Sequence, residues 1–362
     1  MNSRRIFVSD CEGPISKNDN AFELTSHFVP DGDKVFALIS KYDDALADVV
    51  KKPGYKTGTT LKLVIPFLKA YEATNRKVRE YSAESLLPVS GAEGTLQFVS
   101  SRMHAFIVST SYQPYIHALC DFTGFPYENT YCTKLDIDKY TISQGEKERL
   151  KKLRKEIAAM SMIKIPKNAE SLNDFSDEDR KTIERLNEIF WEEIPKMESG
   201  KILEEVNPVG GEEKAGAVQE IVKKLDSELT DVMYVGDSIT DVASFQLVKE
   251  NGGLTVSFNG NEYAVREAEI AVLADNTVIT SVLADVFNRS GRQGAIGLVE
   301  TWGHSVLKKH CSDFKLLENV LKLYPEKLPE VKIITDDNRE KLSEKSCAFR
   351  KKVRGETVGR LG

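Results

Sequence analysis

Residues 5–14 read Arg-Ile-Phe-Val-Ser-Asp-Cys-Glu-Gly-Pro. The short apolar run within this stretch predicts a buried strand bounded by turn residues. The run carries Asp10 to the carboxyl end of that strand, and Gly13 with Pro14 turns the chain away from it. Ligands bind at the carboxyl ends of strands in an open parallel α/β sheet. Asp10 and Glu12 are therefore candidate catalytic carboxylates.

The composition is that of a soluble globular protein. The chain has 362 residues, of which 41% are hydrophobic and 29% charged, and a formal net charge of -6. This length predicts about two or three domains, and the acidic balance gives no general attraction to nucleic acid or to an anionic membrane. No apolar run approaches the roughly 20 residues of a membrane span. Five scattered cysteines without CxxC spacing indicate reduced thiols. We therefore expect a cytoplasmic protein that binds neither nucleic acid nor membrane.

Two further apolar runs also end in polar residues. One run ends in Ser109 and Thr110, and the other ends in Gly-Asp-Ser-Ile-Thr-Asp, which contributes Asp237 and Asp241. Lys214 lies between these runs, at the start of a predicted helix. Taken singly, a serine at a strand end is commonly a cap and a lone lysine is commonly a surface residue. The acids, the hydroxyls and the lysine all follow or lie between apolar runs in one order along the chain, and such an ordered set is improbable by chance.

The chemistry of these residues converges on phosphoryl transfer. Asp10 can attack phosphorus and form an aspartyl-phosphate. Asp10 and Asp237 can together hold Mg²⁺, which takes one or two carboxylates with phosphate oxygens and waters. Ser109, Thr110 and Lys214 would bind the remaining phosphate oxygens through their hydrogen-bond donors.

This ordered set resembles the haloacid dehalogenase (HAD) superfamily of phosphatases. Its motifs are a strand followed by Asp-x-Asp, a strand ending in Ser or Thr, a Lys, and Gly-Asp-x-x-x-Asp. The resemblance implies that Asp10 is the nucleophile and a Mg²⁺ ligand, and that Asp237 is a second ligand. It implies that Glu12 gives its backbone carbonyl to the metal and its side chain to acid/base catalysis. Asp241 would hold a metal-bound water or orient Lys214. Glu12 departs from the usual Asp by one methylene.

The order of the motifs predicts an α/β fold, a Rossmann-like doubly wound parallel sheet with an inserted helical cap and a second helical insertion. The cap position resembles the phosphoserine phosphatase and phosphoglycolate phosphatase branches, and the Asp-Cys-Glu-Gly-Pro form resembles a little-characterised archaeal subgroup. Charged residues dominate the second insertion, which predicts a solvated helical hairpin. The predicted parts are a core of residues 1–15, 88–143 and 201–290, a cap of 16–87, the charged insertion 144–200, and a helical C-terminal extension, 291–362, with a basic and loosely docked tail.

A small phosphorylated metabolite is the expected substrate. Position 19 is Asp and no arginine occurs in residues 6–75, so the sequence does not support phosphoserine specificity. Carbon–halogen cleavage on the same fold needs no metal, which the Asp237 and Asp241 pair argues against, and no cap lysine stands out for phosphonate cleavage. The non-enzymatic alternative is a catalytically weak or inactive binding or scaffold protein. The second insertion and the C-terminal extension are candidate surfaces for a homo-oligomer.

Overall fold

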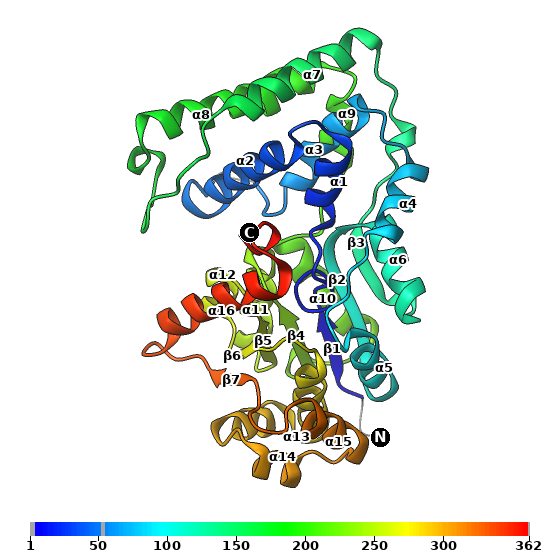
Figure 1. The fold of residues 1–362 in the computed structure, drawn as a ribbon, viewed down its shortest axis with the longest axis vertical. Helices are drawn as coiled ribbons and strands as arrows, with labels where there is room; N and C mark the ends of the chain where they lie inside the picture. Colours follow the sequence, from blue (N-terminus) through cyan, green and yellow to red (C-terminus); the bar gives the residue numbers. More distant parts are fainter. Residues whose placement is uncertain (1–3, 52–54, 361–362) are drawn as a thin grey trace.

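A seven-stranded sheet forms the centre of the molecule (Figure 1). The computed structural model describes residues 4–51 and 55–360. The sheet order is β3-β2-β1-β4-β5-β6-β7, and all neighbouring strands are parallel except β6 and β7. The predicted fold class, a doubly wound α/β core with helical insertions, is confirmed. The strands are β1 (Ile6–Ser9), β2 (His104–Tyr112), β3 (Thr130–Thr133), β4 (Val232–Gly236), β5 (Leu254–Phe258), β6 (Ile270–Leu273) and β7 (Glu330–Ile333).

Helices cover both faces of the sheet, which explains why β1 is buried throughout. Successive side chains of a strand point to opposite faces. Phe7 accordingly packs in one hydrophobic cluster, and Ile6 and Val8 pack in another. The cluster around Phe7 includes side chains of α5 (Ala92–Arg102), α6 (Gln113–Thr123) and α13 (Val278–Glu300). The cluster on the other face includes side chains of α10 (Glu212–Lys224), α11 (Val242–Glu250) and α12 (Glu262–Glu267).

A second layer of helices lies over the carboxyl end of the sheet (Figure 1). Its first part follows β1 and consists of α1 (Asn20–Phe28), α2 (Gly32–Asp44), α3 (Thr60–Ala70) and α4 (Asn75–Glu84). Its second part follows β3 and consists of α7 (Gln144–Ala159), α8 (Asp177–Glu188), the π-helix Ile189–Glu193 and α9 (Gly200–Glu205).

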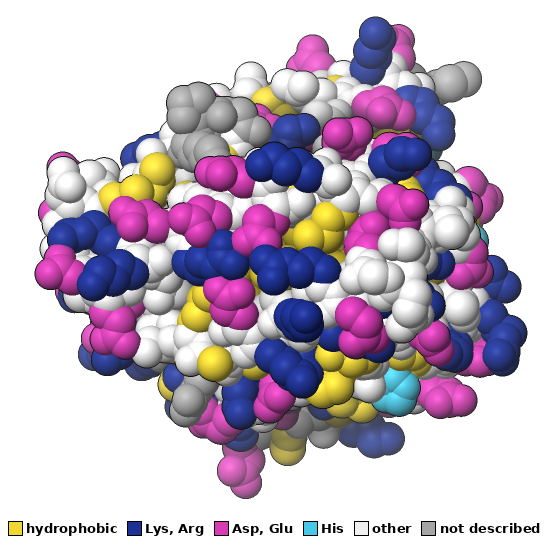
Figure 2. All heavy atoms as spheres, turned by 90° about the horizontal axis from the view of Figure 1, so that it is seen from above, with side chains coloured by type: hydrophobic (Ala, Val, Ile, Leu, Met, Phe, Trp, Pro, Cys, Tyr) yellow, Lys and Arg dark blue, Asp and Glu magenta, His cyan; other side chains and the backbone are white. Residues whose placement is uncertain are grey.

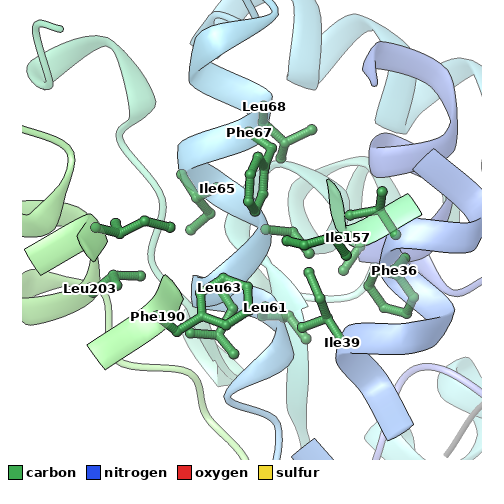
Figure 3. Close-up of a cluster of buried hydrophobic side chains, with 14 of the residues drawn as sticks. Phe36, Ile39, Leu61, Leu63, Ile65, Phe67, Leu68, Ile157, Phe190 and Leu203 are labelled. Carbon is green, nitrogen blue, oxygen red and sulfur yellow. The ribbon is translucent and has the colours of Figure 1, made fainter. Parts of the chain in front are cut away.

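The two parts of this layer share one hydrophobic cluster. Figure 3 shows Phe36 and Ile39 of α2 near Ile157 of α7 on one side of α3, and Phe190 beside Leu63 of α3. All five side chains are at most 3% exposed. The charged insertion therefore packs on the cap helices. Its outer face, seen from above in Figure 2, mixes basic and acidic side chains with scattered apolar ones. The expected homo-oligomer stays a prediction.

The C-terminal extension differs from its prediction in two respects. It contains α14 (His304–His310), α15 (Phe314–Leu323) and α16 (Arg339–Arg354), but also β7, which pairs antiparallel with β6. The expectation of a loosely docked basic tail was wrong for α16, because Ser346 and Arg350 are at most 3% exposed. Figure 1 shows α16 beside α12, between the sheet and the cap helices.

The second strand is longer than its apolar run. The strand that begins at His104 runs on to Tyr112, although the apolar run predicts an end at residue 108. Residues 130–142 form β3 and a 3₁₀ turn, Ile137–Lys139. No helix in residues 4–51 and 55–360 is long and apolar enough to cross a membrane.

Candidate active site

Four of the predicted site residues meet at the carboxyl ends of β1 and β4. These strands are parallel neighbours, so Asp10 and Asp237 follow them at the same edge of the sheet. The fully buried Lys214 reaches this edge from α10. Its Nζ donates to Asp10 Oδ2 at 2.7 Å and to Asp241 Oδ1 at 2.7 Å. The backbone N–H of Cys11 donates to Asp10 Oδ1 at 2.6 Å, so the protein holds both oxygens of Asp10.

Asp241 is bonded through both of its oxygens. The Tyr234 hydroxyl donates to Oδ1 at 2.8 Å, and the backbone N–H groups of Asp237 and Ser238 donate to Oδ2 at 2.9 and 3.0 Å. A Cβ at Gly236 would lie 2.4 Å from Asp241 Cγ, which explains the glycine of the Gly-Asp-x-x-x-Asp motif. Of the two roles expected for Asp241, this geometry favours the orientation of Lys214.

Gly13 allows the chain to leave β1 directly beside the acidic cluster. Its φ of +100° lies in a region that side chains disfavour, and a Cβ there would lie 2.0 Å from Asp237 Oδ2. The turn after Glu12 therefore requires glycine because the Asp237 carboxylate occupies the space.

Ser109 and Thr110 lie in an irregular part of β2. The pairing of β2 with β3 shifts register between Val108 and Tyr112. The Ser109 hydroxyl donates to Ser111 Oγ at 3.1 Å, whereas the buried Thr110 Oγ1 has no hydrogen-bond partner among the described residues. Thr110 also borders the cavity described next. An unpaired hydroxyl at that place is available to an anionic ligand.

A cavity of about 100 Å³ separates the sheet edge from the cap helices. Residues of the core and of the cap both line it. The lining includes Asp10, Glu12, Ser109, Thr110 and Asp237 on the core side and Ser40, Asp43, Asp44 and Thr60 on the cap side.

Burial raises the pKa of both acids of the first motif. The pKa of Asp10 rises from 3.8 to about 7, because burial and the neighbouring carboxylates outweigh the attraction of Lys214. The pKa of Glu12 rises well above its ordinary value, also by burial. Its Oε1 accepts a hydrogen bond of 2.7 Å from the backbone N–H of Asn20, the first residue of α1. Burial lowers the pKa of Lys214, but Asp10 and Asp241 more than offset this effect and keep it protonated.

The C-terminal helix contributes two site residues that the sequence analysis missed. Arg350 and Arg354 both pair with Asp237 Oδ2, the second at 3.1 Å. Arg354 also donates to the backbone carbonyls of Lys17, at 3.0 Å, and Asn18. Their i, i+4 spacing places both arginines on one face of α16, but α16 is rich in basic residues and nothing distinguishes these two in the sequence.

The donor set fits a hard divalent cation. Carboxylate oxygens of Asp10, Asp237 and Asp241 all lie within 4.8 Å of one another, and Mg²⁺ prefers such oxygen ligands. Together with Glu12 and Asp19 these make five carboxyl groups, and three basic side chains, Lys214, Arg350 and Arg354, lie among them. With all eight groups ionised, two negative charges would be left uncompensated, and one divalent cation would balance them.

Comparison with solved structures extends the fold likeness over the whole chain. A gene product of Archaeoglobus fulgidus is similar with a TM-score of 0.81 and 26% identity, over 99% of both chains. A substrate-bound phosphoserine phosphatase matches with a TM-score of 0.46 and 15% identity, over 78% of this chain and 98% of its own. A HAD family hydrolase from Salmonella enterica serovar Typhi matches with a TM-score of 0.43 and 9% identity, over 73% of this chain and 65% of its own. No family model and no curated protein matches the sequence.

Proposed function

We propose that this chain is a Mg²⁺-dependent phosphomonoester hydrolase of the HAD superfamily, with the architecture of its phosphoserine-phosphatase-like branch. The observation that carries the proposal is the buried Lys214, which bridges Asp241 and Asp10, a carboxylate that borders the cavity. A buried lysine between two carboxylates holds a nucleophile in place and supplies positive charge for a phosphate.

In the first step Asp10 attacks phosphorus, forming an Asp10 O–P bond as the ester P–O bond breaks. A Mg²⁺ ion held by Asp10, Asp237 and the backbone carbonyl of Glu12 would neutralise negative charge on the phosphate. Lys214 and the Thr110 hydroxyl donate to phosphate oxygens. Glu12 transfers its proton to the leaving alkoxide.

In the second step Glu12 removes a proton from water, and the resulting hydroxide attacks phosphorus. The Asp10 O–P bond then breaks, inorganic phosphate leaves and the Asp10 carboxylate is restored. The raised pKa of Glu12 suits its role as the acid of the first step. Its side chain accepts a hydrogen bond from the N–H of Asn20, so the first residue of α1 positions the acid.

One observation favours a second candidate function. Arg350 and Arg354 already neutralise Asp237, the carboxylate on which a metal would depend. A catalytically weak or inactive protein that binds a ligand between core and cap would suit this arrangement.

Phosphate release from p-nitrophenyl phosphate and a small panel of metabolites, with and without Mg²⁺, separates the two functions. We expect metal-dependent release by the wild type and none by Asp10→Asn. The matched control is Asp231→Asn, because Asp231 precedes β4 at the opposite edge of the sheet. Turnover by Asp10→Asn would overturn the mechanism. A wild type that hydrolyses nothing and binds no phosphate analogue in the presence of metal would favour the binding protein.

A further inference from the structure

Tyr234 is a fully buried phenol in the middle of the sheet. It lies in β4, which pairs with β1 on one side and with β5 on the other. The centroid of its ring lies 5.5 Å from that of Phe245 of α11, in an edge-to-face contact. Both rings belong to the hydrophobic cluster that includes side chains of α10. Close packing on a central strand leaves the Tyr234 ring little freedom to move.

The Tyr234 hydroxyl is bonded to the carboxylate of Asp241. It donates to Asp241 Oδ1 at 2.8 Å, and the same oxygen accepts the Lys214 ammonium at 2.7 Å. A carboxylate can only accept, so the phenol is the donor. Phenylalanine fills buried positions of the two neighbouring strands, at Phe7 and Phe258. Packing in the sheet therefore does not by itself require the hydroxyl.

This hydrogen bond matters because Asp241 is one of two acceptors that fix Lys214. Lys214 Nζ donates to Asp241 Oδ1 and to Asp10 Oδ2, both at 2.7 Å. An ammonium nitrogen carries three N–H bonds in a tetrahedral arrangement, so fixing two of them also fixes the direction of the third. The acceptors that hold Lys214 thus decide where it can donate to a phosphate oxygen.

The phenol contacts one of the two Asp241 oxygens, and the backbone holds the other. Oδ2 accepts the N–H groups of Asp237 and Ser238 in the turn after β4. Without the phenol, Lys214 would be the one remaining donor to Oδ1 within residues 4–51 and 55–360. The orientation of the carboxylate, and with it the position of the ammonium, would then be less well defined.

We propose that Tyr234 is a positioning residue, whose hydroxyl orients Asp241 so that Lys214 holds the nucleophile Asp10 and directs its remaining N–H to the phosphate. The inference rests on the proposed function, which gives Asp10 and Lys214 their roles. Tyr234 does not border the cavity, so its effect on the reaction passes through Asp241.

Tyr234→Phe removes the hydroxyl and keeps the ring in its cluster. With p-nitrophenyl phosphate and Mg²⁺, we expect kcat to fall about tenfold, the lower end of what one hydrogen bond to a charged group contributes. Lys214 donates to phosphate oxygens in both steps, so kcat should fall whichever step limits turnover. KM should change less than about threefold, because the Thr110 hydroxyl still binds the phosphate. Wild-type kcat in Tyr234→Phe would overturn the inference.

Tyr42→Phe is the matched control for the loss of a buried phenol hydroxyl. Tyr42 of α2 is also fully buried, donates to Asn187 Oδ1 at 2.7 Å and does not border the cavity. Its replacement should lower the urea midpoint of unfolding, as Tyr234→Phe does, but keep kcat within about twofold of the wild type. An equal fall of kcat in Tyr42→Phe would overturn the inference, because the loss of any buried hydroxyl would then suffice.

A double-mutant cycle with Asp241→Asn tests whether Tyr234 acts through Asp241. In that background Tyr234→Phe should change kcat less than about twofold, because the carboxylate that it orients is gone. Effects that multiply in the double variant would overturn the inference. Where Asp241→Asn leaves too little turnover to measure, the comparison of Tyr234→Phe with Tyr42→Phe decides. Wild-type kcat in Asp241→Asn would overturn the inference even if Tyr234→Phe does not fold.

The proposed function and the role of Tyr234 fail in different ways. A wild type that releases no phosphate from any ester refutes the proposed function, and the inference with it. A wild type that hydrolyses esters, together with a Tyr234→Phe variant that does so equally well, refutes the role of Tyr234 alone.

Discussion

Arg350 offers the most direct test of how the C-terminal helix supports the site. Its guanidinium pairs with Asp237, and the two side chains are 4% and 2% exposed. Replacing Arg350 with Met keeps much of the apolar stem but removes the charge, and so leaves a buried carboxylate short of one partner. We expect Arg350→Met to lower the free energy of unfolding.

The size of the loss follows from this burial. Removing one partner of a buried ion pair costs about 3–5 kcal/mol. Arg354 remains 3.1 Å from the same Asp237 oxygen and compensates part of the lost charge, so about 2–3 kcal/mol is expected for Arg350→Met. Solvent screening reduces this value little because both groups are buried.

Urea unfolding followed by circular dichroism measures the loss. The control is Lys352→Met, an exposed cation on the same helix, which should change stability by less than about 0.5 kcal/mol. A double-mutant cycle with Asp237→Asn isolates the pair, because the loss from Arg350→Met should largely disappear in that background. A loss no larger than that of Lys352→Met, or one undiminished in the Asp237→Asn background, would refute the reasoning.

Three further changes have defined outcomes. Gly13→Ala should lower the free energy of unfolding in urea by at least about 1–3 kcal/mol, because its φ is +100° and its Cβ would lie 2.0 Å from Asp237 Oδ2; wild-type stability would contradict this. Thr110→Val removes a hydroxyl without a partner and should raise KM for p-nitrophenyl phosphate about tenfold at unchanged stability; an unchanged KM would contradict a phosphate contact. Burial raises the pKa of Glu23 from 4.5 to about 7. Between these two pH values the folded state holds a proton that the unfolded state has released, so the free energy of unfolding of the wild type falls as pH rises from 4.5 to about 7. Glu23→Gln should lose less stability between pH 5 and pH 8 in urea titrations, and an equal loss would exclude Glu23 as its source.

The involvement of α16 changes the interpretation of the C-terminal extension. Arg354 joins the carbonyls of Lys17 and Asn18, which follow the first motif, to Asp237 of the fourth motif. Helix α16 thereby links the segment that leads into the cap helices to the carboxyl end of β4. Truncations that remove α16 are expected to disturb the site itself as well as the overall stability.

Local patterns were sufficient to predict three neighbouring strands of the sheet, β1, β2 and β4. Their apolar runs are followed by polar or turn residues, and burial on both faces of a parallel sheet requires such runs. The strand β7 was missed because its sequence, Glu-Val-Lys-Ile, alternates polar and apolar residues at the sheet edge. β7 is a strand because it pairs with β6, and its own four residues carry no signal of that pairing.

The sequence by itself determined the class of fold and the acids, lysine and hydroxyls gathered at the sheet edge. It could do so because parallel strands bring their carboxyl ends together wherever the intervening helices lie. Only the tertiary structure placed Arg350 on Asp237, a partner 113 residues away. That contact depends on how α16 packs over the sheet, and side chains that meet only through packing leave no periodic signal in the sequence.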